Sequence, residues 1–211
     1  RGLGDVYKRQ PENAKGKNYL SIECDVSDYS NVQSVFKEII DKWGRIDVLF
    51  NNAGIGNPAN TIDLISKKDW DNLININLNG SFYCAKEAFH YMKSQSPKGG
   101  RIINNGSISA HVPRPGSAPY TVSKHAITGL TKSISLDGRK YNIVCSQIDI
   151  GNAGTEMTKK MSKGIIQASG DIVREPVINV DHIAKAVYDI AELPLNTNIQ
   201  FMTIMAPQCH I

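Results

Sequence analysis

Three side chains between residues 107 and 124 carry groups that can move a proton: the hydroxyl of Ser107, the phenol of Tyr120 and the ammonium of Lys124. Tyr120 and Lys124 are four residues apart, so on a helix they lie on one face. A cation close to a phenol favours the phenolate and lowers its pKa, which makes tyrosine a usable acid or base near neutral pH. The alternative is an ordinary exposed helix face, since such pairs are common on helix surfaces.

Two expected elements would bring Ser107 to Tyr120. The run 101–106 is typical of a buried strand, and Ser107 follows it directly. A helix is expected from Tyr120 to about Leu136, with Pro119 suited to a first turn, where its missing N–H is not needed. A strand end and the following helix can converge on one cleft in an α/β sheet, so the spacing predicts an acid–base site there.

The remaining chain alternates strand and helix patterns, which predicts a doubly wound parallel sheet, a Rossmann-like α/β fold. Apolar residues recur at helical spacing from Val32 to Trp43, and Gly44 can end that helix. We expect further strands at 19–24, 46–50, 143–148 and 200–205, and further helices at about 69–92 and 181–192.

Five short motifs occur in order along these elements. They are Asn51-Asn52-Ala53-Gly54, Asn77-Leu78-Asn79-Gly80, Ser107, Tyr120-Thr121-Val122-Ser123-Lys124, and Ile150-Gly151-Asn152-Ala153-Gly154-Thr155. From about Tyr19 to about Met205 the chain therefore resembles the short-chain dehydrogenase/reductase family of NAD(P)-dependent oxidoreductases.

The resemblance implies four catalytic residues. Ser107 would hold the substrate oxygen, Tyr120 would give or take its proton, and Lys124 would depress the pKa of Tyr120 and hold the nicotinamide ribose. Asn77 would hold a water that connects Lys124 to bulk solvent. The alternative for Asn77 is that of most mid-helix asparagines, a solvated or locally bonded side chain.

The resemblance also implies a cofactor site. In the family, an acidic residue at the place of Asp25 accepts a hydrogen bond from the adenine amino group; alternatively, Asp25 or Ser27 only caps the next helix. Ile150-Gly151 stands where the family usually has Pro-Gly. The implied cofactor-binding residues are Asp25, Val26, Asn52, Ala53 and Gly54 on the adenosine side, then Tyr120 and Lys124, and Gly151 and Thr155, the last against the nicotinamide carboxamide.

Two segments fall outside this pattern. Residues 1–10 resemble a translated sequencing-adapter sequence and we exclude them, which leaves 11–211 as a single domain. The family begins with a βαβ portion of about 30 residues or more, so we expect this first portion to be lacking here. Residues 156–179 correspond to a variable substrate lid, whose Lys159, Lys160 and Lys163 we interpret as a solvated helix face rather than a phosphate clamp.

Composition excludes several other classes of protein. The 211 residues are 41% hydrophobic and 21% charged with a net charge of +4, and their basic residues are scattered, so nucleic-acid binding has little support. Neither a membrane segment nor a signal peptide is indicated. The four cysteines form no C-x-x-C pair and the five histidines no metal spacing, so we expect free thiols, no metal and a cytoplasmic protein.

We therefore expect an oxidoreductase that uses NAD or NADP and acts on a small-molecule alcohol or carbonyl compound. The family implies a homo-oligomer, a dimer or tetramer, for the full-length parent. Two alternatives stay open: a nucleotide-binding regulator without turnover, and an inactive partial translation product.

Overall fold

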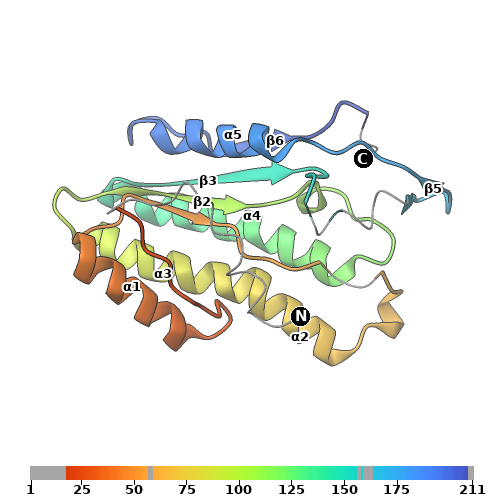
Figure 1. Ribbon diagram of the computed structural model, residues 1–211, viewed down its shortest axis with the longest axis horizontal. Helices are drawn as coiled ribbons and strands as arrows, with labels where there is room; N and C mark the ends of the chain where they lie inside the picture. Colours follow the sequence, from red (N-terminus) through yellow and green to blue (C-terminus); the bar gives the residue numbers. More distant parts are fainter. Residues whose placement is uncertain (1–17, 57–58, 156–157, 159–163, 209–211) are drawn as a thin grey trace.

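A computed structural model describes residues 18–56, 59–155, 158 and 164–208. Its main sheet has four parallel strands in the order β1-β2-β3-β6 (Figure 1). These strands are β1 (Val48–Asn51), β2 (Gly100–Asn105), β3 (Ile143–Ile150) and β6 (Phe201–Ile204). The predicted α/β fold with a parallel sheet is confirmed.

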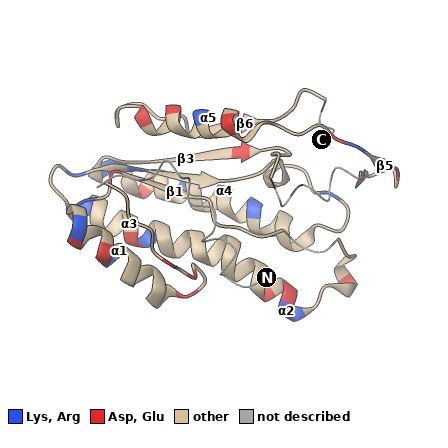
Figure 2. Cartoon of the chain, viewed as in Figure 1, with Lys and Arg blue, Asp and Glu red and all other residues tan. Residues whose placement is uncertain are grey.

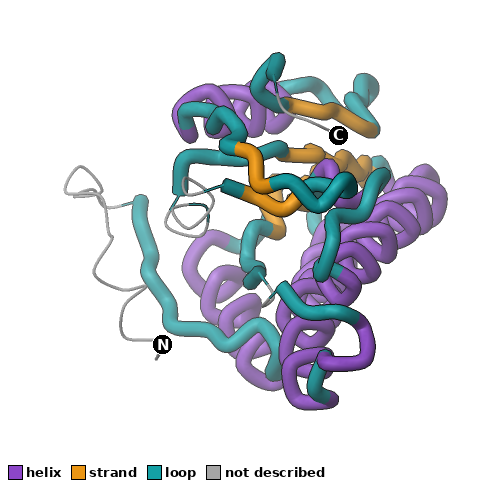
Figure 3. The backbone as a smooth tube through the Cα atoms, turned by 90° about the vertical axis from the view of Figure 1, so that its right-hand side faces the viewer, coloured by secondary structure: helices purple, strands orange, loops and turns teal. Residues whose placement is uncertain are grey.

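Helices cover both faces of this sheet, as a doubly wound fold requires (Figures 1 and 3). One face carries α5 (Val180–Glu192), and the other carries α1 (Tyr29–Trp43), α3 (Gly80–Ser94) and α4 (Ala118–Gly138). Gly44 ends α1 in the left-handed conformation, with φ of 74°, as the sequence predicts.

The hydrophobic core is divided by the sheet. Ile102 and Ile103 of β2 point to opposite faces, and both are completely buried. Ile102 belongs to the cluster that includes Phe36 and Met92 from α1 and α3, whereas Ile103 packs with Ile190 of α5. A central strand that is apolar on both faces is typical of parallel sheets, and it fixes the position at which Ser107 leaves β2.

The expected strand at 19–24 is not formed. The segment is extended, but it makes no ladder with β1, and its contacts are local: Lys42 of α1 donates to the Tyr19 carbonyl, and Cys24 packs on the core. An alternating apolar pattern becomes a strand only where a neighbouring strand offers backbone partners, and none of the described residues does so here.

The helix cap after this segment also differs from both candidates. Asp28, not Asp25 or Ser27, caps α1, and its carboxylate accepts from the backbone N–H groups of Ser30 and Asn31. The hydrogen bond from the Ser30 hydroxyl and, after it, these backbone bonds lower the pKa of Asp28. Asp25 instead closes a local turn, in which its Oδ1 accepts from the backbone and hydroxyl of Ser27.

The helix expected at 69–92 is continuous but not uniform. It begins as α2 (Lys67–Ile74), passes through a π-helical segment at Asn75–Asn79 and continues as α3. Single π turns inside α-helices often mark functional sites, because the extra residue redirects a side chain. Here the redirected residue is Asn77, which is 2% exposed.

The described part of the expected lid is held by hydrogen bonds to one buried carboxylate, that of Glu175. It contains a short antiparallel pair, β4 (Ile165–Ile166) and β5 (Ile172–Val173), followed by Glu175. Glu175 accepts from Arg114 at 2.6 Å, Gln167 at 2.9 Å and Asn152 at 2.5 Å. Lys159, Lys160 and Lys163 lie outside the described residues, as do residues 1–10.

Cysteines in the described ranges are free thiols. Cys145 is completely buried, and Cys24 and Cys84 pack half-buried against the same core cluster. Burial raises the pKa of Cys84 and of Cys145 to about 12, so both are inert thiols at neutral pH. The expected free thiols are confirmed at these three positions, whereas Cys209 lies outside the described residues.

Charged residues of both signs are interspersed along the ribbon (Figure 2). Several form i,i+4 pairs on exposed helix faces, such as Lys37 with Asp41 and Lys185 with Asp189. Pairs of this kind contribute little to stability, because solvent screens exposed charges. Among the described helices, none is long and apolar enough to cross a membrane.

Candidate active site

Ser107 and Tyr120 meet at the carboxyl end of the sheet. Ser107 follows β2, is 7% exposed and starts the buried turn Ile108–Ala110, in which its Oγ accepts from the Ser109 N–H at 3.1 Å. Tyr120 stands in the first turn of α4, directly after Pro119, and its phenol forms a side-chain hydrogen bond with Ser107. The two hydroxyls therefore converge, although 13 residues separate them in the chain.

Lys124 lies one turn further along α4 and points to the same place. It is 6% exposed, its Nζ donates to the Asn105 carbonyl at 2.7 Å, and the Nζ lies 5.5 Å from the centroid of the Tyr120 ring. Burial lowers the pKa of Lys124 to about 8, and the nearby charge of Asp149 opposes that shift. An ordinary exposed helix face is thereby excluded for this Tyr-x-x-x-Lys pair.

The expected lowering of the Tyr120 pKa by Lys124 is wrong for this structure. Burial raises the pKa of Tyr120, and the opposing effect comes from its hydrogen bond with Ser107. The ammonium lies over the ring face and donates to Asn105, so it makes no direct bond to the phenol oxygen. A phenol that stays protonated at neutral pH is suited to donate a proton.

Asn77 braces the turn that follows β1. Its Oδ1 accepts from the Ile55 N–H at 2.8 Å, and its Nδ2 donates to the Ile55 carbonyl at 2.9 Å. A Cβ on Gly54 would lie 3.4 Å from that Oδ1, so the turn runs close to the π-helical segment. The side chain of Asn77 is thus locally bonded, and its backbone carbonyl accepts from Ser81 at 2.9 Å.

The turn after β1 also lies beside Asn105, whose carbonyl accepts from Lys124. Asn52 accepts at its Oδ1 from Asn105 Nδ2 at 2.8 Å, and Asn52 and Ala53 are both exposed at the sheet edge. Asn51 points the other way: it is 7% exposed and bonds Asn104 and the Ser81 carbonyl. Asn51 is therefore structural, whereas Asn52 faces the edge where open α/β sheets bind ligands.

Asp25 and Val26 reach the site region by packing on α3. A Cβ on Gly80 would lie 2.7 Å from a Val26 methyl, so the glycine of the Asn77–Gly80 motif allows this contact. Asp25 is exposed; its carboxylate accepts from Ser27 and its backbone carbonyl from the Asp28 N–H. Val26 therefore lies against the first turn of α3.

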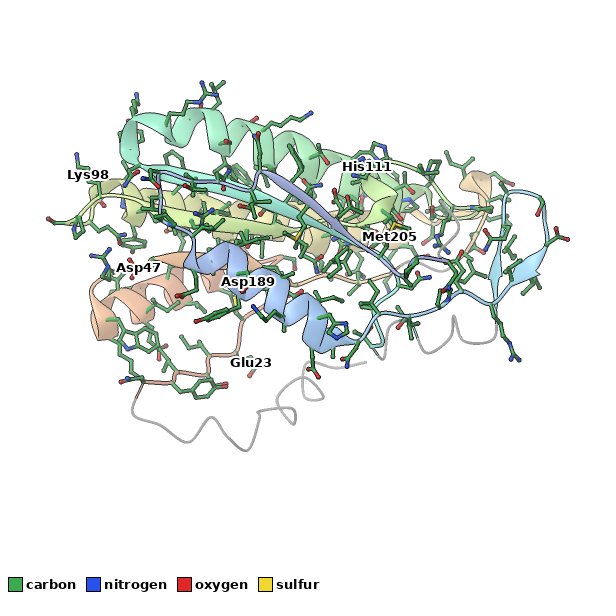
Figure 4. All side chains as sticks on the ribbon, turned by 90° about the horizontal axis from the view of Figure 1, so that it is seen from above. Glu23, Asp47, Lys98, His111, Asp189 and Met205 are labelled. Carbon is green, nitrogen blue, oxygen red and sulfur yellow. The ribbon has the colours of Figure 1, made fainter. Side chains whose placement is uncertain are left out.

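Gly151 and Thr155 follow β3 on the opposite side of the site. A Cβ on Gly151 would lie 2.9 Å from the Met205 Cβ. A residue without a side chain at 151 therefore lets Met205, which follows β6, pack closely against this turn. Thr155 is exposed, and its backbone N–H donates to Ala153 and to the Thr158 hydroxyl. Figure 4 shows His111 and Met205 at this end of the sheet, with Asp47 and Lys98 at the other end.

Two further residues belong to the site and were not predicted. Asp149, near the end of β3, is 1% exposed; its Oδ1 accepts from the Ser107 N–H at 3.1 Å, and its Oδ2 bonds His111 at 2.8 Å. The expected strand ended at Ile148, one residue before this carboxylate. An acidic residue at the carboxyl end of a buried strand is the signal that could have revealed it.

Comparison with known proteins identifies the family and the fold. The family model described as short chain dehydrogenase matches residues 4–165. A 3beta-hydroxysteroid dehydrogenase of Mediterraneibacter gnavus is 35% identical over 164 residues, 78% of this chain and 58% of that protein. A 3-oxoacyl-[acyl-carrier-protein] reductase of Staphylococcus aureus is 34% identical over 149 residues, 71% of this chain and 59% of that protein.

Solved structures give the same result. A gluconate 5-dehydrogenase from Burkholderia cenocepacia, in complex with NADP and tartrate, superimposes with a TM-score of 0.73 at 27% identity, covering 86% of this chain and 71% of that one. The chain therefore spans a little under three fifths of the curated relatives cited above and nearly three quarters of this structure.

Proposed function

The chain belongs to the short-chain dehydrogenase family, and from this premise we propose that the protein transfers a hydride reversibly between NAD or NADP and a secondary alcohol or ketone. One observation carries the proposal: the hydrogen-bonded hydroxyls of Ser107 and Tyr120, with the buried ammonium of Lys124 on the same helix face. Relatives that are named dehydrogenases and reductases support the same reaction class.

The residues present fit a nicotinamide cofactor. An ammonium has three N–H donors, and the described residues give that of Lys124 one close acceptor, the Asn105 carbonyl, so a buried cation retains donors for a ribose diol. Lys124 would hold the nicotinamide ribose and Thr155 the carboxamide beyond Gly151, while the adenosine side would rest on Asn52, Ala53, Gly54, Asp25 and Val26. When bound, this cofactor supplies or accepts the hydride.

Ser107 and Tyr120 would act on the substrate oxygen. In the direction of reduction, both hydroxyls hydrogen-bond the carbonyl oxygen, and the Tyr120 proton moves to it as the carbon becomes an alcohol. In this direction the phenol must carry its proton at the start, and burial, which raises the pKa of Tyr120, keeps it protonated at neutral pH. Donors that are already in place stabilise an oxygen as it gains charge, without reorganisation.

A proton must then return to the Tyr120 phenolate. We propose that it arrives from solvent along Lys124 and a water near Asn77. The Asn77 amide makes one bond at each polar atom, both to Ile55, so one lone pair of Oδ1 and one N–H of Nδ2 are left for such a water.

The proposal is tested by following the oxidation of NADH or NADPH with a panel of small ketones, in the wild type and in Tyr120→Phe. Phenylalanine keeps the ring and removes only the hydroxyl. We expect turnover to fall at least about 10²-fold with cofactor affinity almost unchanged. A variant that retains half of the wild-type rate would remove Tyr120 from the mechanism, and cofactor binding without wild-type turnover would favour a regulator.

A further inference from the structure

Three groups bond the buried carboxylate of Asp149. Its Oδ1 accepts from the Ser107 N–H at 3.1 Å and from Gln147 Nε2 at 2.7 Å, and its Oδ2 lies 2.8 Å from His111 Nε2. The orientation of the Gln147 amide is fixed as well, since its Oε1 accepts from Thr131 and its Nε2 also donates to Thr128. Oδ1 is therefore committed to two donors, and Oδ2 is left for the imidazole.

This arrangement determines which nitrogen of His111 carries the proton. An ionised carboxylate only accepts hydrogen bonds, so Nε2 must be the protonated nitrogen. In the neutral imidazole, Nδ1 then carries a lone pair and acts as an acceptor. Asp149 thus fixes His111 in one tautomer, just as carboxylates orient other functional histidines.

His111 lies at the point where the wall of the site meets solvent. Residues Ile108, Ser109 and Ala110 are all buried, and His111 is the first exposed residue after Ser107, with 52% of its side chain accessible. The Asp149 carboxylate bonds the Ser107 N–H through Oδ1 and the imidazole through Oδ2. The ring therefore lies close to the Ser107 main chain. The imidazole is therefore exposed to solvent beside the turn that begins at Ser107.

Gly106 leaves the space that the Asp149 carboxylate needs to reach His111. A Cβ at this position would lie 2.0 Å from Asp149 Oδ1 and 2.9 Å from Gln147 Nε2, far inside contact distance. Any larger residue at 106 would displace the carboxylate. The side chain of Asp149 therefore occupies space that is available only because residue 106 is glycine.

We propose that His111, oriented by Asp149, is a specificity-determining residue whose Nδ1 accepts a hydrogen bond from a second hydroxyl of the substrate. This deepens the proposed function and rests on it: the preferred substrates are diols and hydroxy ketones. An anionic substituent is disfavoured, because it would face the Nδ1 lone pair with the Asp149 carboxylate behind it. A role confined to folding would leave substrate preference unchanged.

The tautomer is tested without any turnover. Two-dimensional ¹⁵N–¹H spectra of the imidazoles at alkaline pH, with His111 assigned by its loss in His111→Gln, should show protonated Nε2 and unprotonated Nδ1. Asp149→Asn should produce a mixture of tautomers, provided that its melting curve shows a folded protein. A protonated Nδ1, or a mixture already in the wild type, would overturn the inference.

The specificity is tested with matched probes, 2,3-butanediol against 2-butanol, which differ by one hydroxyl. We expect His111→Phe to lower kcat/KM for the diol about 10-fold, the worth of one hydrogen bond, and to change that for 2-butanol less than about twofold. His111→Gln, which keeps an acceptor, should restore part of the preference.

An equal loss on both alcohols would overturn the role of His111 in specificity. If the wild type transferred hydride from neither probe, the proposed function and the substrate role of His111 would fail together. The imidazole spectra would still decide the tautomer, so the two failures are distinguishable.

Discussion

The two ends of β2 both bury polar groups, but they use them differently. At the amino end, the guanidinium of Arg101 is 1% exposed and bonds Asn198 at 2.8 Å and the carbonyls of Leu193, Pro194 and Thr197. Every one of these partners belongs to the loop between α5 and β6. We call this the closed end of β2, because the guanidinium bonds only groups of the protein; its Nε has no hydrogen-bond partner among the described residues.

The carboxyl end keeps its polar groups open to a ligand. Ser107 and Tyr120 bond each other, and Lys124 has one close acceptor among the described residues, so each can still bond to a bound molecule. The difference shows that burial of a polar group does not by itself mark a site. What distinguishes the carboxyl end is that three groups able to bond a ligand, two hydroxyls and an ammonium, converge there.

The largest effect on stability is expected at the closed end. Arg101→Leu removes the donor of four hydrogen bonds to the loop between α5 and β6, so the free energy of unfolding should fall by about 3 kcal/mol. Urea unfolding followed by circular dichroism measures this change. The kcat of the folded variant should equal that of the wild type, and a lower kcat at unchanged stability would break the comparison.

A smaller effect on stability is expected from adding a methyl group at the carboxyl end of β2. Gly106→Ala places a methyl group against Asp149, which should cost about 1–3 kcal/mol and also disturb Ser107, so that turnover falls about 10-fold. Gly129→Ala is the matched control, because a Cβ there meets nothing within 4 Å and alanine suits a helix. Equal behaviour of the two variants in melting and turnover would contradict the close packing at Asp149.

An effect confined to alkaline pH is expected at Lys124, as a pH dependence of stability. Burial lowers the folded pKa from 10.5 to about 8, so between these values the unfolded chain binds more protons and wild-type stability rises with pH. Lys124→Met lacks this titration, and the wild type should gain about 1–3 kcal/mol relative to it across that window. Urea unfolding at a series of pH values measures the difference, and a constant difference would show that the ammonium is not destabilised by burial.

Much of the fold follows from hydrophobic periodicity alone. The helix at α1 and the strand ending at Ser107 were correctly predicted because each pattern is satisfied within one element and its immediate neighbours. The strand at 19–24 was wrong because a strand needs a partner that local sequence does not specify. The π-helical segment around Asn77 has no signature in apolar spacing.

The site was predictable where spacing within one element determines geometry, as for Tyr120 and Lys124. The direction of the Tyr120 pKa was not, because it depends on burial, which only the folded chain defines. Asp149 and His111 escaped prediction for a similar reason. They are 38 residues apart, and only the pairing of β2 with β3 brings them together.

The most direct test of the account is the fate of the hydride itself. NADH and NADPH that carry deuterium at the transferable position would be incubated with the protein and a small ketone, and the product analysed by mass spectrometry. We expect an alcohol with one deuterium on the carbon that bears the new hydroxyl, formed by the wild type and at least about 10²-fold more slowly by Tyr120→Phe. An unlabelled alcohol, or equal rates for the two proteins, would contradict it.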